Sequence, residues 1–211
     1  MPSAVAATRS DQLLDPRATL GRLRRLARLD ASVFSELRDD PTQTLAAALV
    51  AAAAILLGGL GGAVWLLTGV EGVHAGPILL RSFFLGGVAM GAAWFGWLTV
   101  TQLVIERVYA RPIERGALVR VMGFAAAPAA AALVLVLPGL HYAVATLALL
   151  GWFALNTLAI EAVAGGAARR DVFIANAAGF VVCVVALSVL ADAVGVGAGV
   201  FAPGANLAAL R

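Results

Sequence analysis

Five long apolar segments, separated by short polar connections, constrain this chain more than any other feature of its sequence. Each contains about 20 residues or more, the length that an α-helix needs to cross the hydrocarbon core of a bilayer. We predict spans at about 44–67, 79–105, 117–137, 141–163 and 172–191. The sequence therefore predicts an all-α, polytopic membrane protein with five transmembrane helices.

The composition excludes an ordinary soluble domain, in which about half of the residues are apolar. Here 62% are hydrophobic and 13% are charged, with a mean hydropathy of +0.94. The spans leave no room for a second globular domain. We expect a cytoplasmic N-terminal segment (1–43), a membrane domain (44–191) and an outer-side tail (192–211). Because 1–43 is polar, we expect the first apolar run to be a retained anchor and not a cleaved signal.

The arginines predict the orientation of the chain in the membrane. Every Lys or Arg position is Arg, and all except Arg81 and Arg211 lie in 1–43, 106–120 or 164–171. The positive-inside rule then places the N-terminus in the cytoplasm and the C-terminus outside. The Ala-, Gly- and Arg-rich composition is typical of a GC-rich bacterial genome, so we expect the inner membrane. Since topology explains the pI of about 10.0, we do not expect nucleic acid as a partner.

The N-terminal segment has the pattern of a basic amphipathic helix that begins at Asp15-Pro16. Leucines repeat at helical spacing, and arginines occupy much of the remaining circumference. Such a helix lies flat on anionic headgroups. We expect the apolar edge of a second short helix, Val33, Phe34 and Leu37, to lie on the membrane in the same way. Our candidates for lipid or protein contacts are Arg22, Arg24, Arg25, Arg28, Arg111 and Arg115.

Polar residues at the cytoplasmic ends of the spans form a second candidate site. They are Gln102, Glu106, Arg120, Thr157, Glu161 and Asn176. Residues four apart share a helix face, as Gln102 and Glu106 do. The carboxylates either lie at the interface, solvated or paired with Arg, or form a polar mouth for an ion, proton or small solute. No ionisable residue lies near a predicted midplane, which weighs against transport. We expect Asn156 to donate an interhelical hydrogen bond.

Small residues and one proline are expected to shape the packing of the spans. The pairs Gly58/Gly62 and Gly87/Gly91 have the spacing that lets two helices approach closely. The third span contains Gly123 and then Pro128, which has no backbone N–H to donate. We therefore predict a kink at Pro128, near the bilayer centre.

No motif in the chain predicts catalysis. The two histidines, His74 and His141, are far apart and belong to no metal-ligand pattern, and Cys183 lies alone inside an apolar run. Nucleophile and base pairs are also missing. We expect neither an enzyme nor a metal or cofactor site.

Three stretches of the sequence resemble a known family. They are 34–42 (FSELRDDPT) before the first span, Leu118 to Pro128 (LVRVMGFAAAP) in the third, and 138–140 (PGL) followed by Trp152 in the fourth. This pattern resembles the bacterial branch of the Yip family, the Ypt/Rab-interacting five-span membrane proteins. The segment from Arg120 to Pro128 is its most specific part.

The resemblance implies a non-enzymatic membrane-organising or adaptor protein whose Arg-rich cytoplasmic face contacts lipid or protein. Eukaryotic relatives meet small GTPases through their N-terminal segment, but the Asp-Leu-Tyr-Gly-Pro segment of that branch is absent here, so GTPase binding is not carried over. Expected partners are anionic lipid, a second copy of the chain or another membrane protein. The alternative is a small-solute or ion transporter, or a channel subunit.

Overall fold

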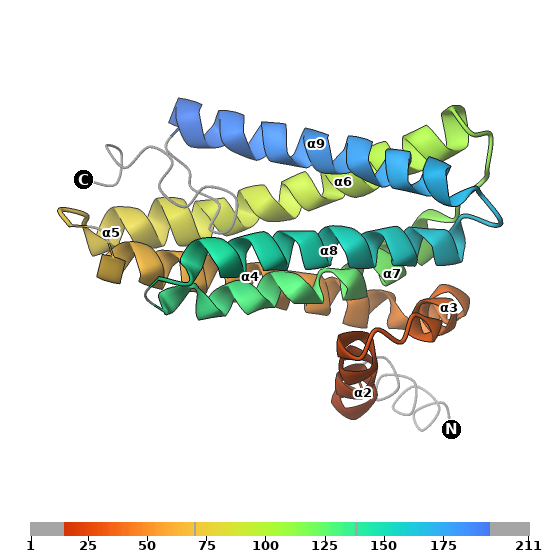
Figure 1. Cartoon of the computed structure of the whole chain (residues 1–211), viewed down its shortest axis with the longest axis horizontal. Coiled ribbons are helices and arrows are strands. Elements are labelled where there is room, and N and C mark those ends of the chain that lie inside the picture. The colour runs from red at the N-terminus through yellow and green to blue at the C-terminus, as the bar shows by residue number, and fades with distance from the viewer. Residues whose placement is uncertain (1–14, 70, 138, 195–211) are drawn as a thin grey trace, which may run out of the picture.

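The computed structural model describes residues 15–69, 71–137 and 139–194, and this part of the chain is helical without strands. Two short helices, α2 (Pro16–Ala27) and α3 (Ser32–Asp39), precede the long helices of the bundle (Figure 1). The all-α prediction is confirmed. Residues 1–14 and nearly all of the expected tail, 192–211, lie outside the described residues.

Five helical segments of 21 to 33 residues are long and apolar enough to cross a membrane, which confirms the predicted polytopic fold. The second combines α5, a π-helix and α6, and the third combines α7 with a 3-10 helix. The elements are η1 (Pro41–Gln43), α4 (Thr44–Gly69), α5 (Ala75–Pro77), η2 (Ile78–Leu85), α6 (Gly86–Arg107), α7 (Arg115–Ala125), η3 (Ala127–Val136), α8 (His141–Val163) and α9 (Arg169–Val194).

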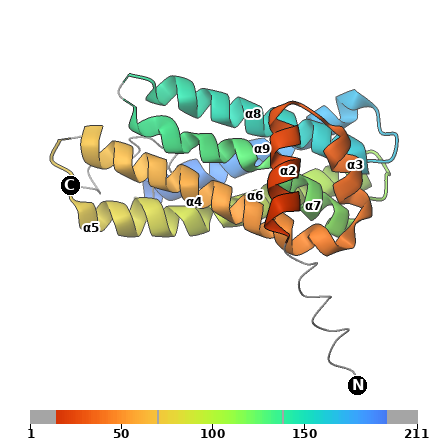
Figure 2. The same ribbon diagram turned by 90° about the horizontal axis from the view of Figure 1, so that it is seen from below.

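The third span lies between α4 and α8. Helix α4 packs along one side of α7 and η3, α8 packs along the other side, and α6 pairs with α9. Consecutive spans run in opposite directions, so α3 lies at one end of the bundle with the end of α6 and the start of α7 (Figures 1 and 2). We call this the α3 end, and the opposite end the α5 end.

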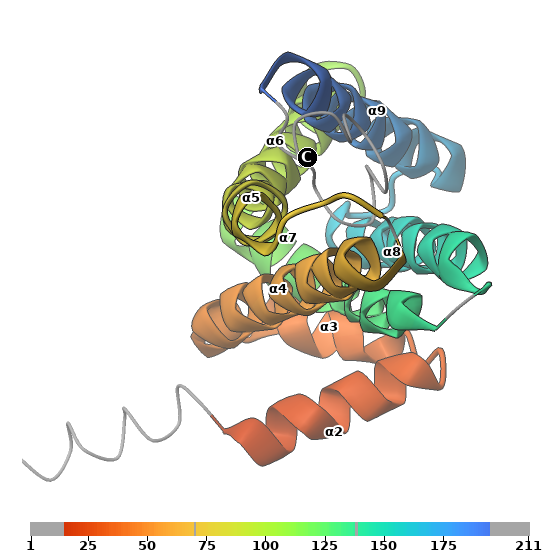
Figure 3. The same cartoon turned by 90° about the vertical axis from the view of Figure 1, so that its left-hand side faces the viewer.

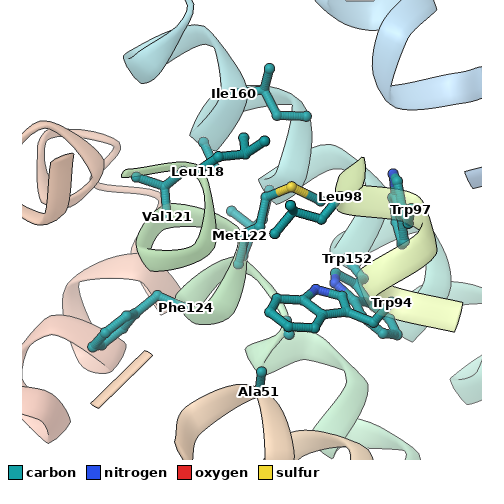
Figure 4. Close-up of a cluster of buried hydrophobic side chains, with 14 of the residues drawn as sticks. Ala51, Trp94, Trp97, Leu98, Leu118, Val121, Met122, Phe124, Trp152 and Ile160 are labelled. Atoms are coloured by element: carbon teal, nitrogen blue, oxygen red, sulfur yellow. The ribbon is translucent and has the colours of Figure 1, made fainter. Parts of the chain in front are cut away.

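Large side chains fill the region where α6, α7 and α8 meet. Trp94 and Trp97 from α6 approach Trp152 from α8, and Met122 comes from α7, whereas Phe124 points to the other side of α7 (Figure 4). The ring centroids of Trp97 and Trp152 lie 5.4 Å apart. These aromatic residues are part of the packed core, as expected for large residues that fill the gap between helices.

Close helix contacts occur at some of the expected glycines but not at all of them. A Cβ on Gly58 would lie 2.9 Å from the carbonyl oxygen of Ala129, and one on Gly123 would lie 2.6 Å from that of Ala47. Gly62 is buried within α4. The expected Gly87/Gly91 pair needs correction. A Cβ on Gly91 would meet no atom within 4 Å, so Gly91 makes no close contact with another described helix.

The expected kink at Pro128 takes the form of a change in helix type. Helix α7 ends at Ala125, and the chain continues from Ala127 as the 3-10 helix η3. Because Pro128 cannot donate to a carbonyl four residues earlier, the α-helix cannot continue unbroken through it. Gly151 of α8 leaves room for the proline ring, since a Cβ there would lie 3.3 Å from the Cβ of Pro128.

Candidate functional site

Helix α2 lies crosswise to the bundle, beside α4 and near α3. Figure 3 looks along the bundle and shows α2 lengthwise while the long helices run away from the viewer. Asp15 caps the helix, because its Oδ1 accepts hydrogen bonds from the backbone N–H groups of Arg17 (2.9 Å) and Ala18 (3.2 Å). Crosswise placement is the geometry expected of a helix in the plane of a membrane interface.

Two of the six candidate arginines hold α2 in place. The guanidinium of Arg25 donates to Asp30 Oδ2, to Ser32 Oγ and to Glu36 Oε1, each at 2.8 Å. Arg22 Nη1 donates to Gln43 Oε1 at 2.8 Å. These side chains link α2 to α3 and to the start of α4, so they serve the fold and are not free for an external partner.

Hydrogen bonds keep the acidic partner of this anchor ionised. The Ser32 hydroxyl, followed by Arg25, lowers the pKa of Asp30 to about 2. The same contacts with Asp30 and Glu36 raise the pKa of Arg25. At the start of α4, the Thr42 hydroxyl lowers the pKa of Asp40, which also accepts a hydrogen bond from Gln43. Both carboxylates are therefore charged at neutral pH.

Three other arginines of α2 are exposed. Arg24 and Arg28 are candidates from the sequence, and Arg17 joins them because residues seven and eleven apart share a helix face. None of the three donates a side-chain hydrogen bond to a residue that the structure describes. We call Arg17, Arg24 and Arg28 the free arginine row. Arg17 is one of the arginines of the predicted amphipathic helix but was not among the six candidates, although its spacing places it on the same face as Arg24 and Arg28.

The remaining two candidate arginines lie elsewhere. Arg115 Nη2 donates to Thr99 Oγ1 of α6 at 3.3 Å, while Arg111 is exposed. The α6–α7 connection and α2 lie on opposite sides of the α3 end (Figure 1). The six arginines therefore do not form one surface.

Helix α3 is packed against the bundle, which corrects the expectation that its apolar edge lies on the membrane. Val33, Phe34 and Leu37 are fully buried, against α7 and α8. Arg120, only 2% exposed, donates to the carbonyls of Leu37 (Nε, 2.8 Å) and Arg38 (Nη2, 2.6 Å). A cation at the C-terminus of a helix stabilises its unpaired carbonyls.

The polar residues expected as one cluster form four separate groups. Gln102 Nε2 donates to Glu106 Oε1 at 2.8 Å, and Arg169 Nε donates to Glu161 Oε1 at 2.9 Å. Arg120 binds α3, as described above. Asn176 bonds within the bundle, so it does not meet Arg120. The pairing of Glu161 with Arg169 fits the first of the two alternatives, a carboxylate paired with Arg, better than a shared polar mouth.

Asn176 connects three helices. Its Oδ1 accepts from Trp97 Nε1 at 2.8 Å, and its Nδ2 donates to Thr157 Oγ1 at 2.8 Å and to the Phe153 carbonyl at 3.0 Å. Asn156 was expected to make such a bond, but its buried amide has no hydrogen-bond partner among the described residues.

Few charged side chains are buried among the residues that the structure describes. Arg120 is the one charged side chain buried in this part of the chain, and a small pocket beside Ser82 and Trp152 has a volume of about 20 Å³. That is room for about one water molecule.

No described group of three His, Cys, Asp or Glu residues could hold a metal ion, and the side chain of His141 lies outside the described residues.

The fold and the site define a class: a helical chain with five helices that could cross a membrane, and with a row of free arginines on a crosswise helix. Comparison with family models, with curated proteins and with solved structures found no match.

Proposed function

We propose that this chain is an integral membrane protein of the Yip type. It acts as a non-enzymatic membrane-organising or adaptor protein whose Arg-rich cytoplasmic face contacts lipid or protein. The observation that carries the proposal is that the arginines of α2 form two groups, one bonded within the chain and one exposed. Arg22 and Arg25 fix the helix crosswise, and the free arginine row stays exposed. An anionic surface attracts such a row by about 1 kcal/mol per arginine.

The proposed setting is a bacterial inner membrane with the α3 end in the cytoplasm. Of the arginines that the structure describes, Arg81 alone lies toward the α5 end. The positive-inside rule favours this orientation. It would place α2 at the cytoplasmic interface, where a basic amphipathic helix is stable.

Two of the stretches that carry the Yip resemblance, 34–42 and Leu118 to Pro128, contact each other, which supports a shared structural role. Arg120 donates to the carbonyls of Leu37 and Arg38 within 34–42. Pro128, at the other end of the same motif, packs on Gly151 beside Trp152. These contacts hold α3 against the third span and the third span against α8.

Lipid enrichment around the reconstituted full chain tests the proposal. Energy transfer from tryptophan to labelled phosphatidylglycerol or phosphatidylcholine would report which lipid gathers at the protein. We expect enrichment of phosphatidylglycerol that falls several-fold when Arg17, Arg24 and Arg28 are replaced by Gln. The matched control replaces Arg107, Arg111 and Arg170, which are also exposed and lie away from α2. Equal enrichment of the two lipids would contradict the lipid part of the proposal.

Transport is the competing function, and a flux assay separates the two. Sealed vesicles containing the protein should show no ion or solute flux above that of empty vesicles. A flux that disappears with Glu106→Gln or Glu161→Gln would favour a transporter or channel subunit instead. The packed tryptophans of Figure 4 and the small volume of the pocket beside them support the non-transport proposal.

A further inference from the structure

We infer that the groove between α2 and α4 binds one acyl chain of an anionic phospholipid, whose headgroup lies on the free arginine row. The inference rests on the proposal that α2 meets lipid at the membrane interface. It goes further by naming a defined site, a ligand class and the residues that hold each part of the ligand.

The groove is a substantial apolar site. Its volume is about 510 Å³, and ligand sites commonly have about 300–1,000 Å³ with mostly apolar walls. The residues that line it include Thr19, Leu20 and Leu23 of α2, and Leu49, Val50 and Ala53 of α4. Asp15, at the first turn of α2, is occupied in capping that helix. The lining therefore suits a hydrocarbon chain.

The wall formed by α2 places positive charge beside an apolar entrance. Leu20 is 50% exposed, and it lies three residues after Arg17 and four before Arg24, so the three share one flank of the helix. Long arginine side chains extend along apolar surface while keeping their charge in a polar environment. A phosphate on this flank meets the free arginine row while its acyl chain passes Leu20 into the groove.

The wall formed by α4 continues the groove toward the middle of the bundle. Leu49, Ala53, Leu56 and Leu60 follow at spacings of four, three and four residues and form one exposed stripe. At 1.5 Å per residue this stripe is about 17 Å long, close to half of the roughly 30 Å hydrocarbon core. An acyl chain that enters beside Leu20 thus has an apolar surface along its length.

Charge and position together favour lipid over other occupants. In water, this groove would leave Leu20 and Leu49 exposed as part of a large apolar patch, which soluble proteins avoid. Helix α4 is apolar enough to cross a membrane, so the groove and the stripe lie where acyl chains are present. Only an amphiphile with an anionic headgroup uses both the apolar walls and the free arginine row.

Photolabelling of the full chain in vesicles tests the inference. The vesicles contain phosphatidylcholine with a minor share of phosphatidylglycerol, and a trace of either lipid carries a diazirine within one acyl chain. We expect labelled phosphatidylglycerol to modify α2 and the first half of α4, and labelled phosphatidylcholine to do so more weakly. Replacing Arg17, Arg24 and Arg28 by Gln should lower this preference, by up to about fivefold per arginine, the equivalent of about 1 kcal/mol each.

Two substitutions fill or disrupt the groove without changing charge. Ala53→Trp should lower labelling of the groove several-fold, and Leu20→Asn should weaken it from the other wall. Ala52→Trp is the matched control, because Ala52 is an exposed neighbour on α4 outside the groove. All of these positions are at least half exposed or lie on the exposed side of a helix, so we expect normal folding by circular dichroism.

The outcomes separate this inference from the proposed function. Groove labelling that survives Ala53→Trp would overturn the site, while a loss of lipid preference in the arginine variant would still support the proposed function. Absence of groove labelling would also overturn it and would indicate residues 1–14 or a second copy of the chain as the occupant. Equal labelling by the two lipids would contradict the anionic headgroup.

Discussion

Two asparagines show how differently one residue type contributes inside this bundle. Asn176 and Asn156 are both fully buried. The Asn176 amide accepts a hydrogen bond from Trp97 of α6 and donates two to α8. The Asn156 amide has no partner among the described residues. A satisfied buried amide stabilises a fold, and an unsatisfied one costs about 1–3 kcal/mol.

Substitution by leucine should therefore have opposite effects at the two positions. Asn176→Leu leaves the indole N–H of Trp97 without its side-chain acceptor, so we expect a loss of about 1–3 kcal/mol in the free energy of unfolding. Asn156→Leu removes an unpaired polar group and should be neutral or stabilising. Steric trapping of the detergent-solubilised variants measures both free energies of unfolding. Equal losses would contradict the proposed difference between the two asparagines.

The position of α2 should resist acid. Because the pKa of Asp30 is lowered to about 2, its contribution to docking is complete above the ordinary Asp value of about 3.9 and is lost as the pH falls through about 2. A fluorophore on α2 should report an undocked helix only at that lower pH. Asp30→Asn should undock α2 already at neutral pH, and an unchanged signal would argue against this anchor.

The partners of individual side chains were the hardest feature to predict from the sequence. The basic amphipathic pattern located α2, but it could not distinguish Arg22 and Arg25, which bind within the chain, from Arg24 and Arg28, which stay exposed. That difference depends on where Gln43, Asp30 and Glu36 lie after folding. The choice between Asn156 and Asn176 likewise depends on the rotation of α8 and α9 about their axes.

At the level of elements, α3 depends on one buried cation. Arg120 contributes charged hydrogen bonds to two carbonyls of α3, each worth about 1.5–3 kcal/mol. We expect Arg120→Gln to release α3, so that its amide hydrogens exchange much faster while those of α6 and α9 remain protected. Arg111→Gln, at an exposed arginine, is the control. Unchanged exchange in α3 would show that Val33, Phe34 and Leu37 suffice to hold it.

Glycines in α6 and α9 should respond oppositely to an added methyl group. A Cβ on Gly179 would lie 2.5 Å from the carbonyl oxygen of Trp97, so Gly179→Ala should cost about 1–3 kcal/mol through overpacking. Gly91 has open space, and Gly91→Ala should instead stabilise the helix by about 0.5–1 kcal/mol. Thermal unfolding in detergent compares the two, and a stabilising Gly179→Ala would disprove the close α6–α9 contact.

The long helices were predictable from sequence because their apolar length alone defines them. The expected 141–163 corresponds to α8, His141–Val163, and the other expected ranges overlap the remaining spans. Helix α3 was not predictable to the same degree. Its apolar edge fits either a membrane surface or a protein surface, and only the tertiary contacts with α7 and α8 distinguish the two. The sequence predicted a kink at Pro128, but it did not predict that the chain would continue as a 3-10 helix from Ala127 to Val136.

For the whole molecule, the proposed orientation in the membrane predicts which end of the bundle can be labelled from outside the cell. Single cysteines at Val108, near the α3 end, and at Glu71, near the α5 end, are both exposed positions. If the α3 end is cytoplasmic, an impermeant maleimide added to intact cells should label Glu71→Cys and not Val108→Cys. The native Cys183 is buried and should stay silent. The reverse pattern would invert the proposed topology.

The 3-10 helix η3 also changes how far the third span reaches. A 3-10 helix rises about 2.0 Å per residue, compared with 1.5 Å in an α-helix. Residues 115–136 therefore extend about 38 Å, whereas a continuous α-helix of the same residues would extend about 33 Å. The 26 residues of α4 extend about 39 Å. By stretching its second half, the span with the fewest residues crosses the same thickness as its longest continuous neighbour, without the bilayer thinning that a short helix would impose.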